Sequence, residues 1–397
     1  MSVTDEARPA APQPPPDRDE GEPARGRDWR ALLRNAGYGA LPVVVSLLVA
    51  AIIGAITILL VRRSFSDLAD VANAMWEYGI VNRDSFAYIF SRATPFIFAG
   101  LASAIAFKAG LFNIGVEGQY AVGAITAAIV GYSVSAPTII HVPLTILAGV
   151  AGGAAWALVP GLLKAWRGAN EVISTIMMNY VANGLVLYLL AGPLRNTPPG
   201  VQQQRTARIE ETAQVGRMNG FFNSLGFDFR PSAPLTWFFA FALLSAVIYA
   251  LVIRRTRFGF NIRVLGLNPR AAEPSGIKAN RLFLIAMLVS GGVAGLVGLQ
   301  DTLGIDGFAK LDYVRGYGFT GIAIALLGRN SGAGIIGAAL LFSYLDRAAT
   351  GIGLRTEVPK ELVTILQGVI LLTIVIAFEL SSRAAARRRL QEVHERA

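Results

Sequence analysis

Long runs of apolar residues, almost free of charge, dominate this chain. A helix rises about 1.5 Å per residue, so about 20 apolar residues cross the roughly 30 Å hydrocarbon core of a bilayer. The strongest runs are 41–61, 142–163, 172–190, 235–253, 282–299 and 362–380. Weaker, Gly-rich runs are 93–109, 114–132, 318–327 and 333–350. Together they predict an all-α, polytopic membrane protein with about ten transmembrane helices.

The composition supports a membrane protein and narrows the chemistry. Only 16% of the residues are charged and 53% are hydrophobic, whereas soluble domains contain about 25% charged residues. The absence of cysteine excludes thiolate metal sites, disulfides and cysteine nucleophiles. His141 and His394 are the only two histidines, so a multi-histidine metal centre is excluded as well. We therefore expect no metal and no cofactor.

The chain divides into two tails and one membrane domain. Residues 1–35 are Pro-rich and lack an apolar run, which predicts a disordered cytoplasmic tail. Residues 36–380 form the predicted transmembrane domain, and 381–397 a basic cytoplasmic tail. Lys and Arg favour cytoplasmic segments, so both termini and the basic segment 254–281 are placed inside, and 193–234 becomes an extracytoplasmic loop. The positive net charge then reflects topology, and no nucleic-acid partner is expected.

The inner segment 254–281 has seven basic residues and one acidic residue, Glu273. Asn268 can cap free backbone donors and Pro269 suits a first helical turn, so a short helix is predicted to start there. Gly276 is a natural stop for it. Such a helix suits docking into a cleft on a cytoplasmic partner. The alternative is a solvated loop with an incidental turn.

Four motifs occur in order: GLFNIGVEGQY at 110–120, ANEVISTIMMNY at 169–180, GLNPRAAEPSGI at 266–277 and GFTGIAIALLG at 318–328. Together they make residues 40–380 resemble the permease subunits of ATP-binding-cassette importers for nucleosides and simple sugars. These belong to the larger branched-chain amino acid and ribose permease family.

The resemblance implies an all-helical subunit of a bacterial plasma membrane. Its implied partners are a second permease, alike or identical, two cytoplasmic ATP-binding subunits, an extracytoplasmic substrate-binding protein, and membrane lipid. Nucleosides are the first choice of substrate, and simple sugars such as ribose the second. The residues that match the family's ATPase-coupling pattern are Gly266, Asn268, Pro269, Ala271, Ala272, Gly276 and Ile277. The chain departs from that pattern at Glu273-Pro274-Ser275.

The sequence contains no Gly-x-x-x-x-Gly-Lys-Ser/Thr motif, so we expect a partner to hydrolyse ATP. An ion-coupled secondary transporter remains an alternative. A membrane-embedded enzyme is a second alternative, for which Asp301, Asp306 and Asp312 are the only acidic group of interest. No catalytic residue is assigned.

Polar residues inside apolar runs are costly unless they face a cavity or a partner. Two stripes at helical spacing stand out: Asn113, Glu117 and Gln119, and Glu171, Thr175, Asn179 and Asn183. We expect these side chains to line or support a substrate pathway. The alternative is that they form hydrogen bonds between helices that fix the bundle, and Glu117 and Glu171 could also cap or pair near helix ends.

Two pairs of glycines have the four-residue spacing that lets membrane helices approach closely. They are Gly149 with Gly153, and Gly291 with Gly295. Packing is the favoured interpretation, and a sliding surface is the alternative.

Overall fold

The computed structural model describes residues 44–46, 48–60, 64–272, 274, 276–310, 316–356, 358–359, 361–373, 376–377 and 380. Within these residues the regular elements are helices and there is no strand, although two isolated bridges occur. The all-α prediction is confirmed. The predicted tails 1–35 and 381–397, and Asp312, Glu273 and Ser275, lie outside the described residues.

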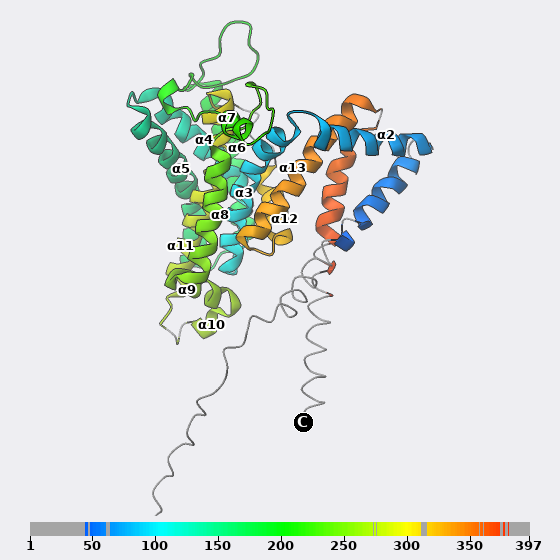
Figure 1. The fold of residues 1–397 in the computed structure, drawn as a ribbon. Coiled ribbons are helices and arrows are strands. Elements are labelled where there is room, and N and C mark those ends of the chain that lie inside the picture. The colour runs from blue at the N-terminus through cyan, green and yellow to red at the C-terminus, as the bar shows by residue number, and fades with distance from the viewer. Residues whose placement is uncertain are drawn as a thin grey trace, which may run out of the picture.

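The predicted membrane runs correspond to helices, which lie roughly side by side in Figure 1. The labelled ones are α3 (Ser85–Lys108), α4 (Val116–Ser133), α5 (Thr138–Arg167), α6 (Glu171–Ala191), α8 (Phe238–Arg255), α11 (Ala279–Ala294), α12 (Tyr317–Leu327) and α13 (Gly332–Arg355). The first and last runs appear as Val44–Leu60 and Glu361–Thr373. Among the described residues, α3, α5, α6, α8 and α13 are long and apolar enough to cross a membrane.

One predicted span, α12, is shorter than a bilayer. Its 11 residues extend over only about 16 Å, roughly half of the hydrocarbon core. The π-helix η4 (Gln300–Asp306) and residues 307–310 follow α11, and the next described residue is Gly316 at the start of α12. Irregular backbone of this kind occurs at membrane depth where it is enclosed by protein or lines a cavity.

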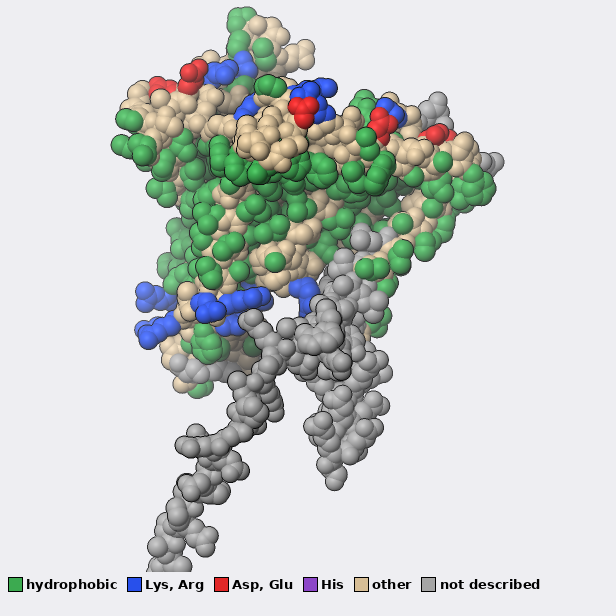
Figure 2. Space-filling model, viewed as in Figure 1, with side chains coloured by type: hydrophobic (Ala, Val, Ile, Leu, Met, Phe, Trp, Pro, Cys, Tyr) green, Lys and Arg blue, Asp and Glu red, His purple; other side chains and the backbone are tan. Residues whose placement is uncertain are grey.

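The two ends of the bundle carry different elements (Figure 1). At one end, residues 192–237, which include α7 (Asn219–Ser224), cover the helices, and α2 (Phe65–Trp76) lies at the same end in contact with α13. We call this end the loop face. The opposite end, the basic face, carries α9 (Arg257–Leu267) and α10 (Pro269–Ala272), and Figure 2 shows a band of Lys and Arg side chains there.

Helix α3 lies at the centre of the bundle. It contacts α8, α11, α12 and α13, and most of its side chains are buried. In contrast, α6 presents large apolar side chains such as Ile173, Tyr180 and Leu187 on its surface. An apolar exterior of this kind suits contact with lipid. A polar side chain on the buried helix α3, in contrast, needs a hydrogen-bond partner or a cavity.

The two predicted glycine pairs pack against each other. A Cβ atom on Gly153 would lie 2.3 Å from the carbonyl oxygen of Gly291. A Cβ atom on Gly295 would lie 2.2 Å from the carbonyl oxygen of Gly149. Only glycine permits this approach of α5 and α11, so the pairs serve packing, as the favoured interpretation held.

Candidate functional site

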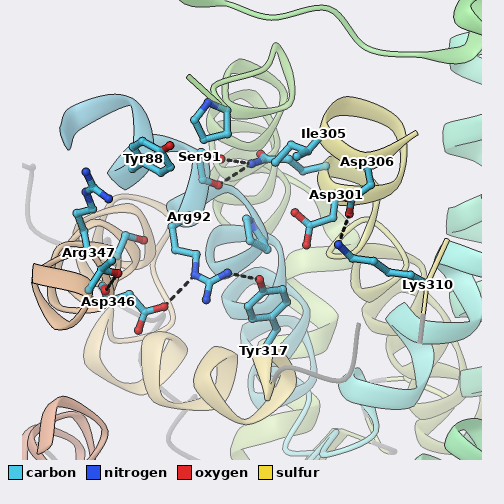
Figure 3. A pocket seen from close by; sticks show the side chains of 15 residues that line it. Tyr88, Ser91, Arg92, Asp301, Ile305, Asp306, Lys310, Tyr317, Asp346 and Arg347 are labelled. Carbon is cyan, nitrogen blue, oxygen red and sulfur yellow. Dashed lines mark hydrogen bonds and ion pairs between the residues drawn. The ribbon is translucent and has the colours of Figure 1, made fainter. Parts of the chain in front are cut away.

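A cavity of about 350 Å³ opens among α3, α13 and the segment after α11, near the loop face (Figure 3). Three basic and three acidic side chains line it together with hydroxyl, amide and aromatic groups. The polar lining residues are Tyr88, Ser91, Arg92, Gln300, Asp301, Asp306, Lys310, Tyr317, Ser343, Asp346, Arg347 and Thr350. Among the described lining residues the opposite charges are equal in number and leave no net charge, so the lining suits a neutral polar molecule.

Arg92 connects three elements at this cavity. Its Nε atom lies 2.9 Å from Oδ2 of Asp346 on α13, and its Nη1 donates a 2.5 Å hydrogen bond to the hydroxyl of Tyr317 on α12. Gln367 donates to the other carboxylate oxygen of Asp346 over 3.2 Å. The partners of Arg92 lie far from it in the sequence, so this network depends on the packing of α3 against α12 and α13 (Figure 3).

On the other wall, Gln300 is buried and its Nε2 donates to both the carbonyl and the hydroxyl oxygen of Ser91, each over 2.7 Å. The Oε1 atom of Gln300 is buried without a hydrogen-bond partner. Nearby, Lys310 and Asp306 form a 2.8 Å ion pair. A buried acceptor without a partner is unfavourable, and this one belongs to a residue in the wall of the cavity.

The side chains of the first predicted stripe form hydrogen bonds inside the bundle. Asn113 donates to Gln119 and to Ser290, each over 2.8 Å, and Gln119 donates back to Asn113 over 3.0 Å. Ser290 in turn donates to the carbonyl of Ala102 over 2.7 Å. These bonds hold the start of α4 against α3 and α11.

Glu117, in the same stripe, joins the starts of α4 and α12. Its buried carboxylate accepts 2.8 Å hydrogen bonds from the backbone N–H groups of Gly316 and Gly318, and a 2.7 Å bond from the hydroxyl of Tyr120. A carboxylate at the start of a helix satisfies free N–H groups and interacts favourably with the helix dipole. Glu117 therefore fixes α12, which carries Tyr317 into the cavity.

The second stripe makes similar contacts. Asn179 accepts from the N–H of Gly118 and donates to the carbonyl of Ile114, each over 2.9 Å. Thr175 donates to the carbonyl of Glu171 over 2.6 Å, and the Glu171 carboxylate pairs with Lys164 at 2.9 Å.

Asn183 completes this stripe, and its Oδ1 is buried without a partner. None of the seven residues of the two stripes lines the cavity of Figure 3. Their role in a pathway therefore stays a prediction.

The short helix predicted after Asn268 is present as α10, which starts at Pro269. The main-chain carbonyl of Asn268 accepts a hydrogen bond from the backbone N–H of Ala272, whose side chain is buried. Gly276 adopts a positive φ of 78°. Gly266 lies against the end of α3, because a Cβ there would be 2.4 Å from the carbonyl of Lys108. The absence of a side chain at Gly266 therefore allows the loop to pack this closely against α3.

The remaining matched residues of this loop are Ala271 and Ile277, and the latter is partly exposed beside Gly276. A cavity of about 430 Å³ opens at this point of the basic face. The ATPase-coupling role of the whole set stays a prediction.

The cavity residues Arg92, Gln300, Tyr317, Asp346 and Arg347 were missed by sequence reasoning. A signal was present, because ionisable residues within or beside apolar runs mark functional positions. Arg92 directly precedes the run 93–109, and Asp346 lies inside the run 333–350.

A bundle of apolar helices around a polar cavity is typical of a membrane transport protein. The profile of a family described as "Branched-chain amino acid transport system / permease component" matches residues 85–375. The chain belongs to this family. It is a multi-pass membrane protein and the permease component of an ABC transport system, and it is not an enzyme.

Three relatives illustrate the family. The guanosine ABC transporter permease protein NupP of Bacillus subtilis is 37% identical over 286 residues, which cover 72% of this chain and 79% of the relative. The glucose permease protein TsgB13 of Haloferax volcanii is 33% identical and covers 78% of this chain and 80% of its own. The nucleoside permease protein NupB of Lactococcus lactis is 33% identical, covering 72% and 77%. No solved structure matches the chain.

Proposed function

We propose that this chain forms the membrane pathway of an ATP-driven importer that takes up nucleosides. The observation that carries the substrate class is the similarity to NupP and NupB, whose names state guanosine and nucleoside transport, over most of their length.

The chemistry of the cavity supports a nucleoside-like solute. Nucleosides are neutral, carry hydroxyl groups and have a flat aromatic base. The cavity offers three basic and three acidic side chains, the amide of Gln300, and the aromatic rings of Tyr88 and Tyr317. Hydroxyl groups bind well between such donors and acceptors, and aromatic side chains favour a planar base.

The residues of the two polar stripes do not line the cavity, and we propose that they support this path by fixing the helices around it. Glu117 fixes the start of α12, and the Asn113 and Asn179 networks fix the start of α4. A cavity whose walls are held in this way keeps its geometry while substrate binds.

The basic face is proposed to contact the cytoplasmic ATP-binding subunits through α9 and α10. Leu267 is 88% exposed at the junction of these helices, and Gly276 and Ile277 line a cavity in the segment that follows α10. Exposed apolar side chains suit a protein partner. A second permease subunit and an extracytoplasmic substrate-binding protein complete the proposed assembly.

The orientation follows from charge. Lys and Arg form a band at the basic face (Figure 2), and such residues favour the cytoplasmic side. We therefore place the basic face and both termini in the cytoplasm of a bacterium, and the loop face outside its plasma membrane.

Simple sugars are the second candidate. TsgB13, whose name states glucose transport, covers as much of the chain as the nucleoside relatives do. Hydroxyl groups are common to both classes of solute, so the presence of a base is the feature that separates them.

The test is uptake of labelled guanosine and uridine, with ribose and glucose in parallel, in cells that carry or lack this chain. Each strain is compared with the partner ATPase intact and inactivated. The proposal expects nucleoside uptake that needs both proteins and is competed by unlabelled nucleosides. Uptake of sugar alone would assign the second candidate, and uptake without the ATPase would contradict ATP coupling.

A further inference from the structure

A second polar cavity lies on the basic face, and the proposed function assigns it no ligand. Its volume is about 360 Å³. Four basic side chains line it: Lys108 at the end of α3, Arg254 at the end of α8, Arg263 on α9, and Arg329 in the turn between α12 and α13.

Lys108, Arg254 and Arg263 bring three like charges together in this cavity. No acidic side chain is among the described residues that line it. The loop-face cavity, in contrast, has as many acidic as basic groups. Cations that share a confined space repel one another, and the favourable way to reduce this cost is a multivalent anion.

The turn that carries Arg329 is fixed in an unusual conformation. Arg329 and Asn330 have positive φ angles of 55° and 50°, which are uncommon outside glycine. The hydroxyl of Tyr249, also in the lining, donates to the carbonyl of Asn330 over 2.9 Å and holds the turn. Backbone strain of this kind is frequent where side chains must be presented to a ligand.

The position in the bundle indicates the class of anion. Lys108 and Arg254 are in the last turns of α3 and α8, where membrane helices leave the hydrocarbon. Phosphate groups of phospholipids lie at this level, and basic pockets between helices on the cytoplasmic side bind anionic headgroups. Arg also matches phosphate oxygens with two parallel hydrogen bonds.

We propose that this cavity binds a phosphate group at the cytoplasmic membrane interface. The group belongs to an anionic phospholipid or to a soluble phosphate compound, and the recognition chemistry is the same for both. The proposal does not depend on which solute the permease carries.

The test uses the full-length chain in nanodiscs of phosphatidylcholine with a minor share of phosphatidylglycerol. Lipid that stays bound after ejection from the disc is counted by native mass spectrometry. In a parallel arm, pyrophosphate is titrated in discs that contain phosphatidylcholine alone.

The key variant is Arg254→Gln with Arg263→Gln, and the matched control is Arg255→Gln with Arg257→Gln. The control removes two charges from exposed residues of the same helices that do not line the cavity. We expect binding of at least one probe to weaken by about tenfold or more in the key variant and to change by less than about twofold in the control.

Retention of phosphatidylglycerol alone identifies a lipid, and binding of pyrophosphate identifies a soluble compound; either supports the proposal. Equal losses in both variants, or no binding of either probe to the natural chain, would overturn it. Because the key variant could fold poorly, Arg254→Lys with Arg263→Lys is included. It keeps the charge but not the paired hydrogen bonds of Arg, so it should bind the same probe more tightly than the Gln variant does. Binding as weak as in the Gln variant, with an intact thermal midpoint, also counts against the site.

Discussion

The carboxylate of Glu117 accepts a 2.8 Å hydrogen bond from the backbone N–H of Gly318, which lies 201 residues further along the chain. This bond joins the first turn of α4 to the first turn of α12 in the interior of the bundle. Tyr317 is thereby held where its hydroxyl meets Arg92. The wall of the loop-face cavity thus depends on a residue that does not line it.

Glu117→Gln is expected to destabilise the protein. The carboxylate accepts from three donors, whereas a carboxamide presents one nitrogen that is itself a donor. A buried donor left without an acceptor costs about 1–3 kcal/mol. We expect a lower thermal midpoint of the purified chain, whereas Glu211→Gln, at an exposed residue of the short 3-10 helix η2 (Glu211–Ala213), should leave it unchanged. Equal midpoints would mean that the bond does not support α12.

The pair of Arg92 and Asp346 is expected to show coupling in a double-mutant cycle. Arg92→Gln leaves the carboxylate without its cation, and Asp346→Asn leaves the cation without its carboxylate. Removing both avoids an unpaired charge, so the double variant should be more stable than the sum of the single effects predicts. Thermal midpoints of the four proteins test this, and additive effects would contradict it. Uptake should fall in all three variants because Arg92 also holds Tyr317.

Gln300→Met and Asn183→Leu form a matched comparison. Both residues have a buried carboxamide oxygen without a partner, but only Gln300 lines the loop-face cavity. If Gln300 binds substrate, its loss should raise the KM for uptake by about tenfold, the effect of one hydrogen bond of about 1.4 kcal/mol. Asn183→Leu should leave KM unchanged.

Ser91→Ala controls for the contact that Gln300 makes within the protein. It should affect KM less than Gln300→Met does. A large effect of Asn183→Leu with none of Gln300→Met would instead place the pathway along the α6 stripe.

Gly153→Ala is expected to separate α5 from α11. The added methyl group would lie 2.3 Å from the carbonyl oxygen of Gly291, which cannot move without its helix. Overpacking of this type costs about 1–3 kcal/mol. Gly337→Ala in α13 meets nothing within 4 Å and should leave the thermal midpoint unchanged or slightly raised, since alanine favours helix. A Gly153→Ala protein as stable as its control would contradict the close packing.

Much of the fold is predictable from local sequence. An apolar run of about 20 residues must form a helix in a membrane, because only a helix satisfies its backbone hydrogen bonds internally. The runs 142–163 and 172–190 accordingly fall within α5 and α6. The start of α10 at Pro269 was also predictable locally, since proline suits the first turn of a helix. In contrast, the run 318–327 predicted a span, and its helix α12 is too short to cross alone.

The glycine pairs show the limit of this reasoning. Their spacing predicted close approach to some helix, but nothing local states that Gly149 and Gly153 face Gly291 and Gly295. The same holds for the polar stripes. Helical spacing placed Asn113 and Gln119 near each other, whereas the contact of Asn113 with Ser290 comes from another part of the chain.

The sequence by itself thus determined the helices, the membrane environment and the family, because apolar length and short motifs act within one segment. Only the tertiary structure decided which polar side chains face each other and which face a cavity. Arg92 meets Asp346 across 254 residues, and Gln300 meets Ser91 across 209. Such pairings depend on the rotation and depth of each helix in the bundle, which are set by packing among all the helices together.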